Sequence, residues 1–201
     1  MMRGGLFLTR QARRRAAMLL STLAFLAACL TAAPVQAAEM RGPGDWGWLS
    51  GVLLYDTRLI SRKGGNDGVA FNVEVQTPRI VRGRSWAPRL AVGATYAVDG
   101  ISQAYAGPVW DLPVTRRLSL SPGLGVSVHD AEHLTFADAQ GTGYDRKLLG
   151  CRVLARASLG LGYRVSERVI VQLHYDHVSN GGTCTNNQGL DNTGVRVGFR
   201  F

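Results

Sequence analysis

Apolar and polar residues alternate along most of the chain beyond residue 45. Between Val69 and Val75, for example, every odd position is apolar, whereas the even positions include Asn72 and Glu74. This period of two is typical of β-strands, because successive side chains of a strand point to opposite faces. The pattern predicts eight strands, of which the first and fourth are less regular, in the ranges 46–57, 69–76, 90–98, 103–112, 118–128, 149–163, 169–180 and 195–201.

A soluble β-sandwich would show the same alternation, so the second face of the strands has to distinguish it from a membrane barrel. It combines Gly and Ser with charged residues such as Glu74, Arg156 and Arg196. A membrane barrel turns its apolar face to lipid and keeps a polar interior, and strands of about ten residues suit a tilted crossing. The chain also ends on Phe201 behind alternating apolar residues, as outer-membrane barrels do. We therefore predict an eight-stranded antiparallel transmembrane β-barrel of the bacterial outer membrane.

The segments between the strands are rich in Gly, Asn, Asp and Pro, which favours turns. Barrels of this kind have short periplasmic turns and long extracellular loops. With both chain ends on the periplasmic side, the long segments 129–146 and 180–189 are expected to be extracellular. The segment 78–85 is expected on the periplasmic side, where it is rather long for a turn.

The 201 residues carry a formal net charge of +9, and its location changes its meaning. Five arginines precede residue 16, an apolar run follows at 16–33, and small residues precede Glu39. This order is typical of a secretory signal peptide, with cleavage near Ala37 or Ala38. We expect a signal at 1–37 and the barrel at 38–201. An uncleaved anchor helix and a lipoprotein box ending at Cys29 are the alternatives.

Cleavage after residue 37 leaves 18 basic and 14 acidic residues, a net charge of +4. Nucleic-acid binding thereby loses its main support, and no nucleic-acid module or phosphate-binding glycine loop occurs in the sequence. Two cysteines remain, Cys151 and Cys184, at the start of the sixth strand and in the loop after the seventh. Export permits their oxidation, and a disulfide between them would pin that loop.

The seventh and eighth strands place three reactive residue types on one face. Odd-numbered residues of both strands face lipid, as Phe199 and Phe201 indicate, so that His177, Ser179 and Asp191 point outward near the same rim. A serine nucleophile, a histidine base and an orienting carboxylate form the arrangement of a serine hydrolase, so we expect the barrel at 38–201 to carry a catalytic site at its extracellular rim. Polar groups on a lipid-facing surface are costly, although the cost falls near the rim.

The segment 177–182 (His-Val-Ser-Asn-Gly-Gly) resembles the His-x-Ser-Asn signature of the PagL family, the lipid A 3-O-deacylases. The resemblance implies an outer-membrane barrel that hydrolyses the ester-linked 3-hydroxyacyl chain of lipid A, a carboxylic ester hydrolase without a cofactor. Ser179 matches the family's nucleophile and His177 its base, while Asp191 stands where the family typically has Glu. The shorter carboxylate needs a close strand register to reach the imidazole.

The resemblance also implies residues that stabilise the oxyanion. Gly182 and Asn187 fall at the positions linked to this role, and Asn180 matches the Asn of the signature. The implied partner is lipopolysaccharide, and a homodimer is left open. The alternative function is a non-enzymatic outer-membrane barrel that serves adhesion or envelope integrity, which has no need to gather His177, Ser179 and Asp191.

Other polar clusters receive plainer interpretations. His174 and Asp176 have even numbers and are expected in the lumen beside arginines. His129 and His133, with the acids between them, could bind a metal, but a solvated loop is favoured and no metal site is predicted. Basic residues near the outer rim could pair with lipid A phosphates, namely Arg62, Lys63, Arg146 and Lys147.

Overall fold

The computed structural model describes residues 46–61, 68–81, 84, 86–132, 134–135 and 147–201. The predicted signal at 1–37 lies outside these residues. Within them, no helix has the length and apolar character needed to cross a bilayer. The described strands are β1 (Gly47–Tyr55), β2 (Gly68–Arg79), β3 (Arg89–Ala97), β4 (Gln103–Val109), β5 (Leu112–Pro113), β6 (Leu118–His129), β7 (Val153–Arg164), β8 (Val169–Ser179) and β9 (Leu190–Arg200).

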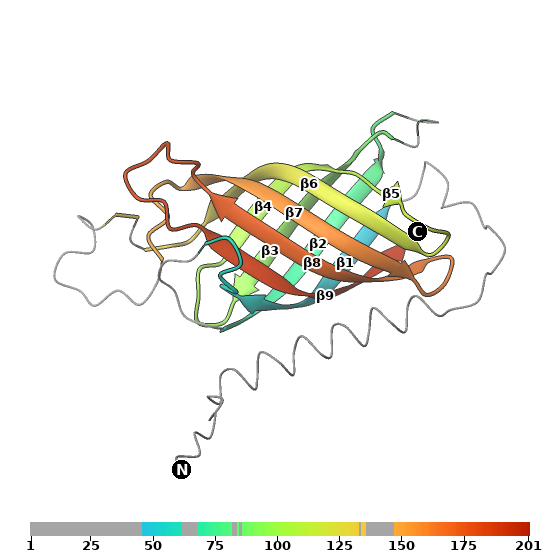
Figure 1. Ribbon diagram of the computed structural model, residues 1–201, viewed down its shortest axis with the longest axis horizontal. Coiled ribbons are helices and arrows are strands. Elements are labelled where there is room, and N and C mark those ends of the chain that lie inside the picture. Colours follow the sequence, from blue (N-terminus) through green and yellow to red (C-terminus); the bar gives the residue numbers. More distant parts are fainter. Residues whose placement is uncertain (1–45, 62–67, 82–83, 85, 133, 136–146) are drawn as a thin grey trace, which may run out of the picture. The chain divides into compact units, whose positions relative to one another are not determined.

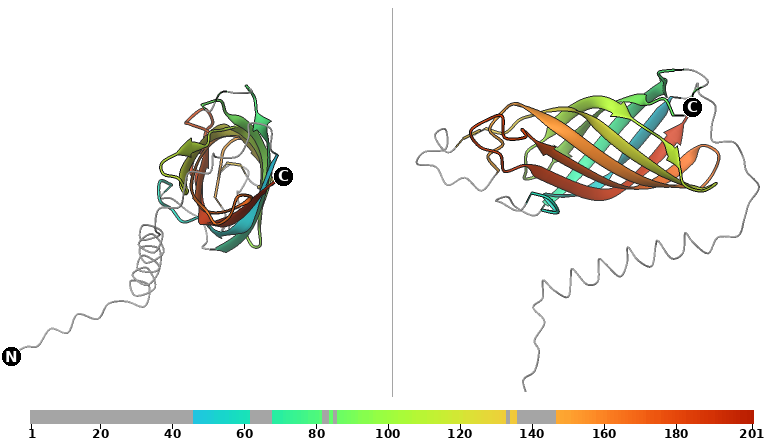
Figure 2. Two further views of the ribbon diagram at one scale, coloured as in Figure 1. Left: turned by 90° about the vertical axis from the view of Figure 1, so that its right-hand side faces the viewer. Right: turned by 45° about the horizontal axis from the view of Figure 1, so that its top comes forward.

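These strands form one closed antiparallel sheet (Figure 1; Figure 2, left). Each long strand pairs with its neighbours in the chain, β1 pairs with β9, and β4 pairs with β6. The two-residue β5 extends the line of β4 and also pairs with β6, so it adds no further wall. The predicted eight-stranded barrel is therefore confirmed, and closure leaves no unpaired edge in the membrane.

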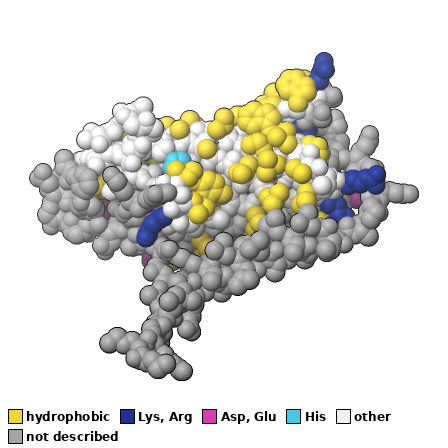
Figure 3. Space-filling view, in the orientation of Figure 1, with side chains coloured by type: hydrophobic (Ala, Val, Ile, Leu, Met, Phe, Trp, Pro, Cys, Tyr) yellow, Lys and Arg dark blue, Asp and Glu magenta, His cyan; other side chains and the backbone are white. Residues whose placement is uncertain are grey.

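Apolar side chains cover the outside of the barrel wall (Figure 3). On β2 the outward residues Val69, Phe71, Val73 and Val75 are each more than two-fifths exposed. The inward residues of the same strand include Asn72 and Glu74, which are buried. This inverted distribution, apolar outside and polar inside, is the one that a lipid environment selects.

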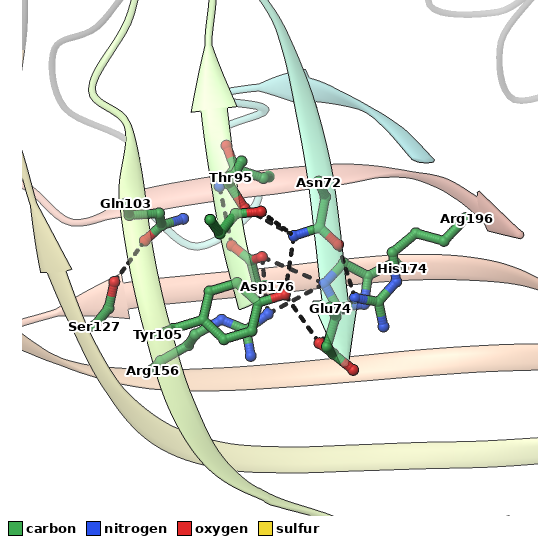
Figure 4. Close-up of polar contacts among 12 residues, drawn as sticks. Asn72, Glu74, Thr95, Gln103, Tyr105, Ser127, Arg156, His174, Asp176 and Arg196 are labelled. Atoms are coloured by element: carbon green, nitrogen blue, oxygen red, sulfur yellow. Dashed lines mark hydrogen bonds and ion pairs between the residues drawn. The ribbon is translucent and has the colours of Figure 1, made fainter. Parts of the chain in front are cut away.

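The polar interior forms a connected network across the lumen (Figure 4). Glu74 of β2 accepts hydrogen bonds from Arg196 of β9 and from the Tyr105 hydroxyl of β4, at 3.0 and 2.9 Å. Asp176 of β8 pairs with Arg156 of β7 at 3.1 Å, and that guanidinium lies 3.7 Å from the centre of the Tyr105 ring. Buried charges are tolerated where they are paired and hydrogen-bonded in this way.

His174 and Asp176 also lie in this network, as the sequence predicts. His174 Nε2 is 3.3 Å from Asp176 Oδ2. An apolar cluster occupies the lumen near one end of the network. It joins side chains from most of the wall, including Leu53, Ile101, Leu154, Val178 and Leu190.

Leu149 belongs to this apolar cluster as well, with 1% of its surface exposed. The prediction that a lipid-facing strand begins at residue 149 is therefore wrong. Strand β7 begins only at Val153, because Gly150 has a positive φ of 78° that interrupts the extended chain.

The two ends of the barrel differ in their connections. Trp46 and Phe201 exchange backbone hydrogen bonds of 3.0 and 3.1 Å, so both ends of the barrel chain meet at one rim. The segment 180–189 extends from the opposite rim, far from the C-terminus in Figure 1. The β8–β9 connection therefore lies at the rim opposite the chain ends, the rim that the sequence assigns to the extracellular side.

Candidate active site

His177 of β8 and Asp191 of β9 are directly opposite each other in the antiparallel register. Their Nδ1 and Oδ1 atoms are 2.6 Å apart. A carboxylate can only accept, so His177 Nδ1 donates this hydrogen bond and Nε2 is left as the basic nitrogen. The direct cross-strand position is what allows an aspartate, one methylene shorter than glutamate, to reach the imidazole.

Asp191 is held by three further donors. The Tyr175 hydroxyl donates to Oδ1 at 3.0 Å, and the backbone N–H groups of Ile60 and Ser61 donate to Oδ2 at 2.8 and 2.7 Å. Asp191 has the same parity as the lipid-facing Val195, yet none of its surface is exposed. The chain after β1 covers it, and the four donors satisfy a carboxylate that would otherwise be costly to bury.

The covering segment, residues 56–61, is fixed by its own contacts. Asp56 and Arg58 adopt left-handed backbone conformations, with φ of 53° and 55°. The Thr57 N–H donates to the backbone carbonyl of Asp191 at 2.9 Å. The Lys147 ammonium reaches Asp56 at 2.6 Å and donates to the Ser61 hydroxyl at 3.0 Å. Two fixed charges therefore anchor the segment that holds the candidate acid.

Lys147 has no exposed side-chain surface. The alternative in which Lys147 pairs with lipid A phosphates therefore does not fit its position, because its ammonium is buried against Asp56 and Ser61. Arg62, Lys63 and Arg146 lie outside the described residues.

Ser179 ends β8 on the same face as His177, two residues further along the strand. It is partly exposed, opposite Ala155 of β7. Among the described residues, no hydrogen bond links its hydroxyl to His177. Catalytic hydrogen bonds are often long before substrate binds, so the shared face is the informative feature.

The loop after Ser179 is organised around Asn180. This residue is 5% exposed, and its side-chain amide donates to the carbonyls of Leu149 and Asn186 at 2.8 and 2.5 Å. Its Oδ1 accepts the Gly182 N–H at 2.8 Å, and its own N–H donates to Asn187 Oδ1 at 3.1 Å. The three predicted oxyanion residues are thus brought together, but the donors of Asn180 and Gly182 are already engaged, in the loop and with the Leu149 carbonyl. The Asn187 amide is at the exposed surface.

A disulfide joins Cys151 to Cys184, whose Cα atoms are 6.0 Å apart. It ties the same loop to the residues just before β7.

The segment from His129 to His133 was the alternative candidate for a metal site. No group of three or more His, Cys, Asp or Glu side chains there could hold a metal ion. His129 is 8% exposed and its Nε2 lies 2.6 Å from the Cys151 carbonyl, so the prediction of a solvated loop is wrong at this residue. His133 lies outside the described residues.

Sequence reasoning missed Tyr175, Ile60 and Ser61. Tyr175 shares the parity of His177 and could have been found by that signal. Ile60 and Ser61 act through backbone N–H groups, for which the sequence carries no signal.

A closed eight-stranded sheet with an apolar outside and a polar inside defines this molecule as an outer-membrane β-barrel protein. Comparison with family models then gives the particular family. The model described as lipid A 3-O-deacylase (PagL) matches residues 70–200, so the chain belongs to the PagL family. It resides in the bacterial outer membrane, and lipid A is the substrate that membership in the family implies.

Solved structures agree on the fold. The crystal structure of the outer-membrane enzyme PagL is similar at 16% identity and a TM-score of 0.51, covering 77% of this chain and 98% of that one. The crystal structure of Neisserial surface protein A is similar at 15% identity and a TM-score of 0.52, and the match covers 79% of this chain and 97% of that one. The N-terminal barrel domain of Pseudomonas aeruginosa OprF is similar at 13% identity and a TM-score of 0.52, and the match covers 80% of this chain and 100% of that one. A comparison with curated protein sequences gives no match.

Proposed function

We propose that this protein is a lipid A 3-O-deacylase that uses Ser179, His177 and Asp191. One observation carries the proposal. A buried carboxylate with four donors orients a histidine on the outer face of the barrel, next to a serine on the same face. The residues 70–200 matched by the family model contain all three side chains.

The reaction proceeds through an acyl-enzyme. The Ser179 oxygen attacks the carbonyl carbon of the 3-hydroxyacyl ester, and His177 Nε2 takes its proton. The tetrahedral intermediate expels the 3-oxygen of the sugar, which receives that proton from the imidazolium. A water molecule, activated by the same Nε2, then hydrolyses the acyl-serine and releases the fatty acid. Asp191 stays ionised and stabilises the imidazolium through Nδ1.

The oxyanion requires donors that are not already used. Asn180 and Gly182 give the loop its shape, since the Asn180 amide donates to the Leu149 and Asn186 carbonyls and the Gly182 N–H donates to Asn180 Oδ1. The Asn187 side chain has its Oδ1 turned to the Asn180 N–H, which leaves its NH₂ group for the oxyanion. We therefore assign Asn187 the direct role, and Asn180 and Gly182 the role of shaping the loop.

The outward position of the site suits a substrate that is itself a membrane lipid. Lipid A in the outer leaflet can reach Ser179 by lateral diffusion, without entering the lumen. The reaction needs no cofactor. Cross-linking in the native membrane would decide whether the barrel acts as a monomer or as a homodimer.

Mass spectrometry of lipid A from cells expressing the protein tests this function. The wild type should remove one 3-hydroxyacyl mass, and Ser179→Ala should leave lipid A intact. Ser50→Ala is the matched control, because Ser50 lies on β1, on the lipid-facing side, away from the site. Unchanged lipid A with folded wild-type protein would favour the non-enzymatic alternative, a barrel for adhesion or envelope integrity.

A further inference from the structure

The covering segment, residues 56–61, buries the polar residues at its two ends and exposes two apolar side chains between them. Asp56 and Ser61 are 0% and 7% exposed. Leu59 and Ile60, by contrast, are 61% and 62% exposed. A connecting segment in water usually has the opposite distribution, because exposed apolar surface is unfavourable there. The outer side of this segment is therefore suited to contact with lipid.

Leu59 and Ile60 are as exposed as the most exposed apolar side chains of the barrel wall. Leu124 of β6 is 60% exposed and Tyr96 of β3 is 61% exposed, and both are on the lipid-facing side of their strands. Leu59 and Ile60 follow the end of β1 at the rim opposite the chain ends. They thus extend the lipid-facing apolar surface of the wall to the rim that carries the candidate site.

The backbone of the covering segment is tied directly to that site. The Ile60 N–H donates to Asp191 Oδ2 at 2.8 Å, while His177 Nδ1 donates to Oδ1 of the same carboxylate at 2.6 Å. A single carboxylate therefore separates Ile60 from the candidate base. Thr57 and Ser61 also donate backbone hydrogen bonds to Asp191, so the segment is held on both sides of Leu59 and Ile60.

We infer that Leu59 and Ile60 contact an acyl chain of the lipid substrate and so help to position its ester at His177 and Ser179. This inference rests on the proposed deacylase function. A lipid that reaches the site in the plane of the membrane brings its acyl chains along the outer wall. Apolar side chains favour contact with such a chain and offer nothing to the sugar or its phosphates. Leu59 and Ile60 are thus specificity-determining residues for a fatty acyl group and take no part in proton transfer.

Steady-state kinetics of lipid A deacylation test this role, with the folded protein in detergent micelles that contain increasing amounts of lipid A. The test variant is Leu59→Ser with Ile60→Ser, which removes the apolar surface and keeps the backbone N–H group that binds Asp191. KM for lipid A should rise about tenfold while kcat stays within about twofold, because the contact is equally strong in the ground state and in the transition state.

The matched control is Val69→Ser with Val98→Ser. These side chains are 42% and 50% exposed at the same rim, on β2 and just after β3, and β9 and β1 separate them from β8. The control also removes two exposed apolar side chains, but its KM should change less than about twofold. Equal rises of KM in both double variants would indicate a general contact with the micelle and would overturn the inference.

The remaining outcomes separate this inference from the proposed function. A wild type that does not deacylate lipid A rules out the function, and the inference with it. An active wild type with an unchanged KM in the test variant rules out the inference alone. A fall in kcat at constant KM does so too, because it would mean that the two side chains only support Asp191. Folding is checked by heat-modifiable mobility on a gel, and Ile60→Ser alone, with an expected rise in KM of about threefold, replaces the double variant if that one does not fold.

Discussion

At the scale of the residue, Asp191 is the point on which the candidate site depends. It points to the lipid side of β9, yet residues 56–61 cover it and four donors bind its carboxylate. The four donors are therefore placed to bind a carboxylate at the end of a side chain as short as that of aspartate. An orienting acid with so complete a set of donors holds the imidazole in one tautomer and one rotamer.

Removal of the Asp191 charge should lower the rate much more than removal of one of its partners. Asp191→Asn keeps the shape but favours the wrong tautomer of His177, so we expect the deacylation rate to fall about 10²- to 10⁴-fold. Tyr175→Phe keeps the charge and should cost less than tenfold. Rates are measured on purified lipid A by mass spectrometry. Similar rates for Asp191→Asn and the wild type would remove Asp191 from the mechanism.

The sequence predicted part of this site. Parity alone placed His177, Ser179 and Asp191 on one face, because a strand alternates strictly. Ile60 and Ser61 could not be predicted, since they lie 131 and 130 residues from Asp191 in the chain and use only backbone atoms. Their position depends on closure between β1 and β9.

At the scale of the element, the segment 56–61 depends on the buried ion pair of Asp56 and Lys147. Burial raises the pKa of the Asp56 carboxyl above its ordinary value, and Lys147 lowers it in part. Lys147→Met removes the closer cation of Asp56 and leaves only the partly exposed Arg58, 3.5 Å away, so it should cost up to about 3–5 kcal/mol in the free energy of unfolding. Asp56→Asn with Lys147→Met should recover much of that loss, because Asn tolerates the left-handed backbone.

The cost of Lys147→Met should also depend on pH. Without the ammonium, the folded-state pKa of Asp56 rises further above its value in the unfolded chain. Protonation of Asp56 then favours the folded state, so the loss should be smallest at acidic pH, should grow as the pH rises above the folded-state pKa of Asp56 in the wild type, and should level off above its folded-state pKa in the variant. Urea unfolding in lipid vesicles at several pH values measures this. A loss that stays constant with pH would contradict the assignment to Asp56.

The loop between β8 and β9 depends on the disulfide between Cys151 and Cys184. The bridge spans 33 residues of chain, so Cys151→Ser with Cys184→Ser should lower the free energy of unfolding by ~2–4 kcal/mol. The loop carries Asn187, and its release should also lower deacylation several-fold. Adding reductant to the wild type provides the matched measurement. Equal stability and activity with and without the bridge would show that the hydrogen bonds of the loop, including those of Asn180 and Gln188, hold it without the disulfide.

Strand boundaries were predicted less well than strands. Alternation identifies a strand of the barrel only where one of its faces is apolar. The first residues of β9 include the polar Asp191, Asn192 and Thr193, so the sequence did not reveal that the strand begins at Leu190. Leu149 caused the opposite error, because its apolar side chain led to a strand that was predicted to begin too early. Its side chain fills the lumen instead of facing lipid, and composition does not distinguish these two apolar environments.

At the scale of the whole molecule, the inverted distribution of apolar and polar residues was predictable, because it is present in every strand. Val73 is at the middle of β2 on the lipid side, and Val69 is near the rim on the same face. Val73→Arg should cost about 2–4 kcal/mol in the free energy of unfolding, and Val69→Arg about 0–1 kcal/mol. Unfolding in vesicles measures both values. Equal costs would mean that the apolar belt is not centred on Val73.

The pairing of β1 with β9 determines when the candidate site is assembled. The N–H groups of Ile60 and Ser61 come from the first strand connection, and Asp191 and His177 come from the last hairpin. These parts meet only when the two terminal strands pair, which is the final step that turns a sheet into a ring. A chain whose terminal strands have not yet paired therefore lacks the complete set of donors around Asp191, so the proposed deacylase should become active only once the barrel has closed.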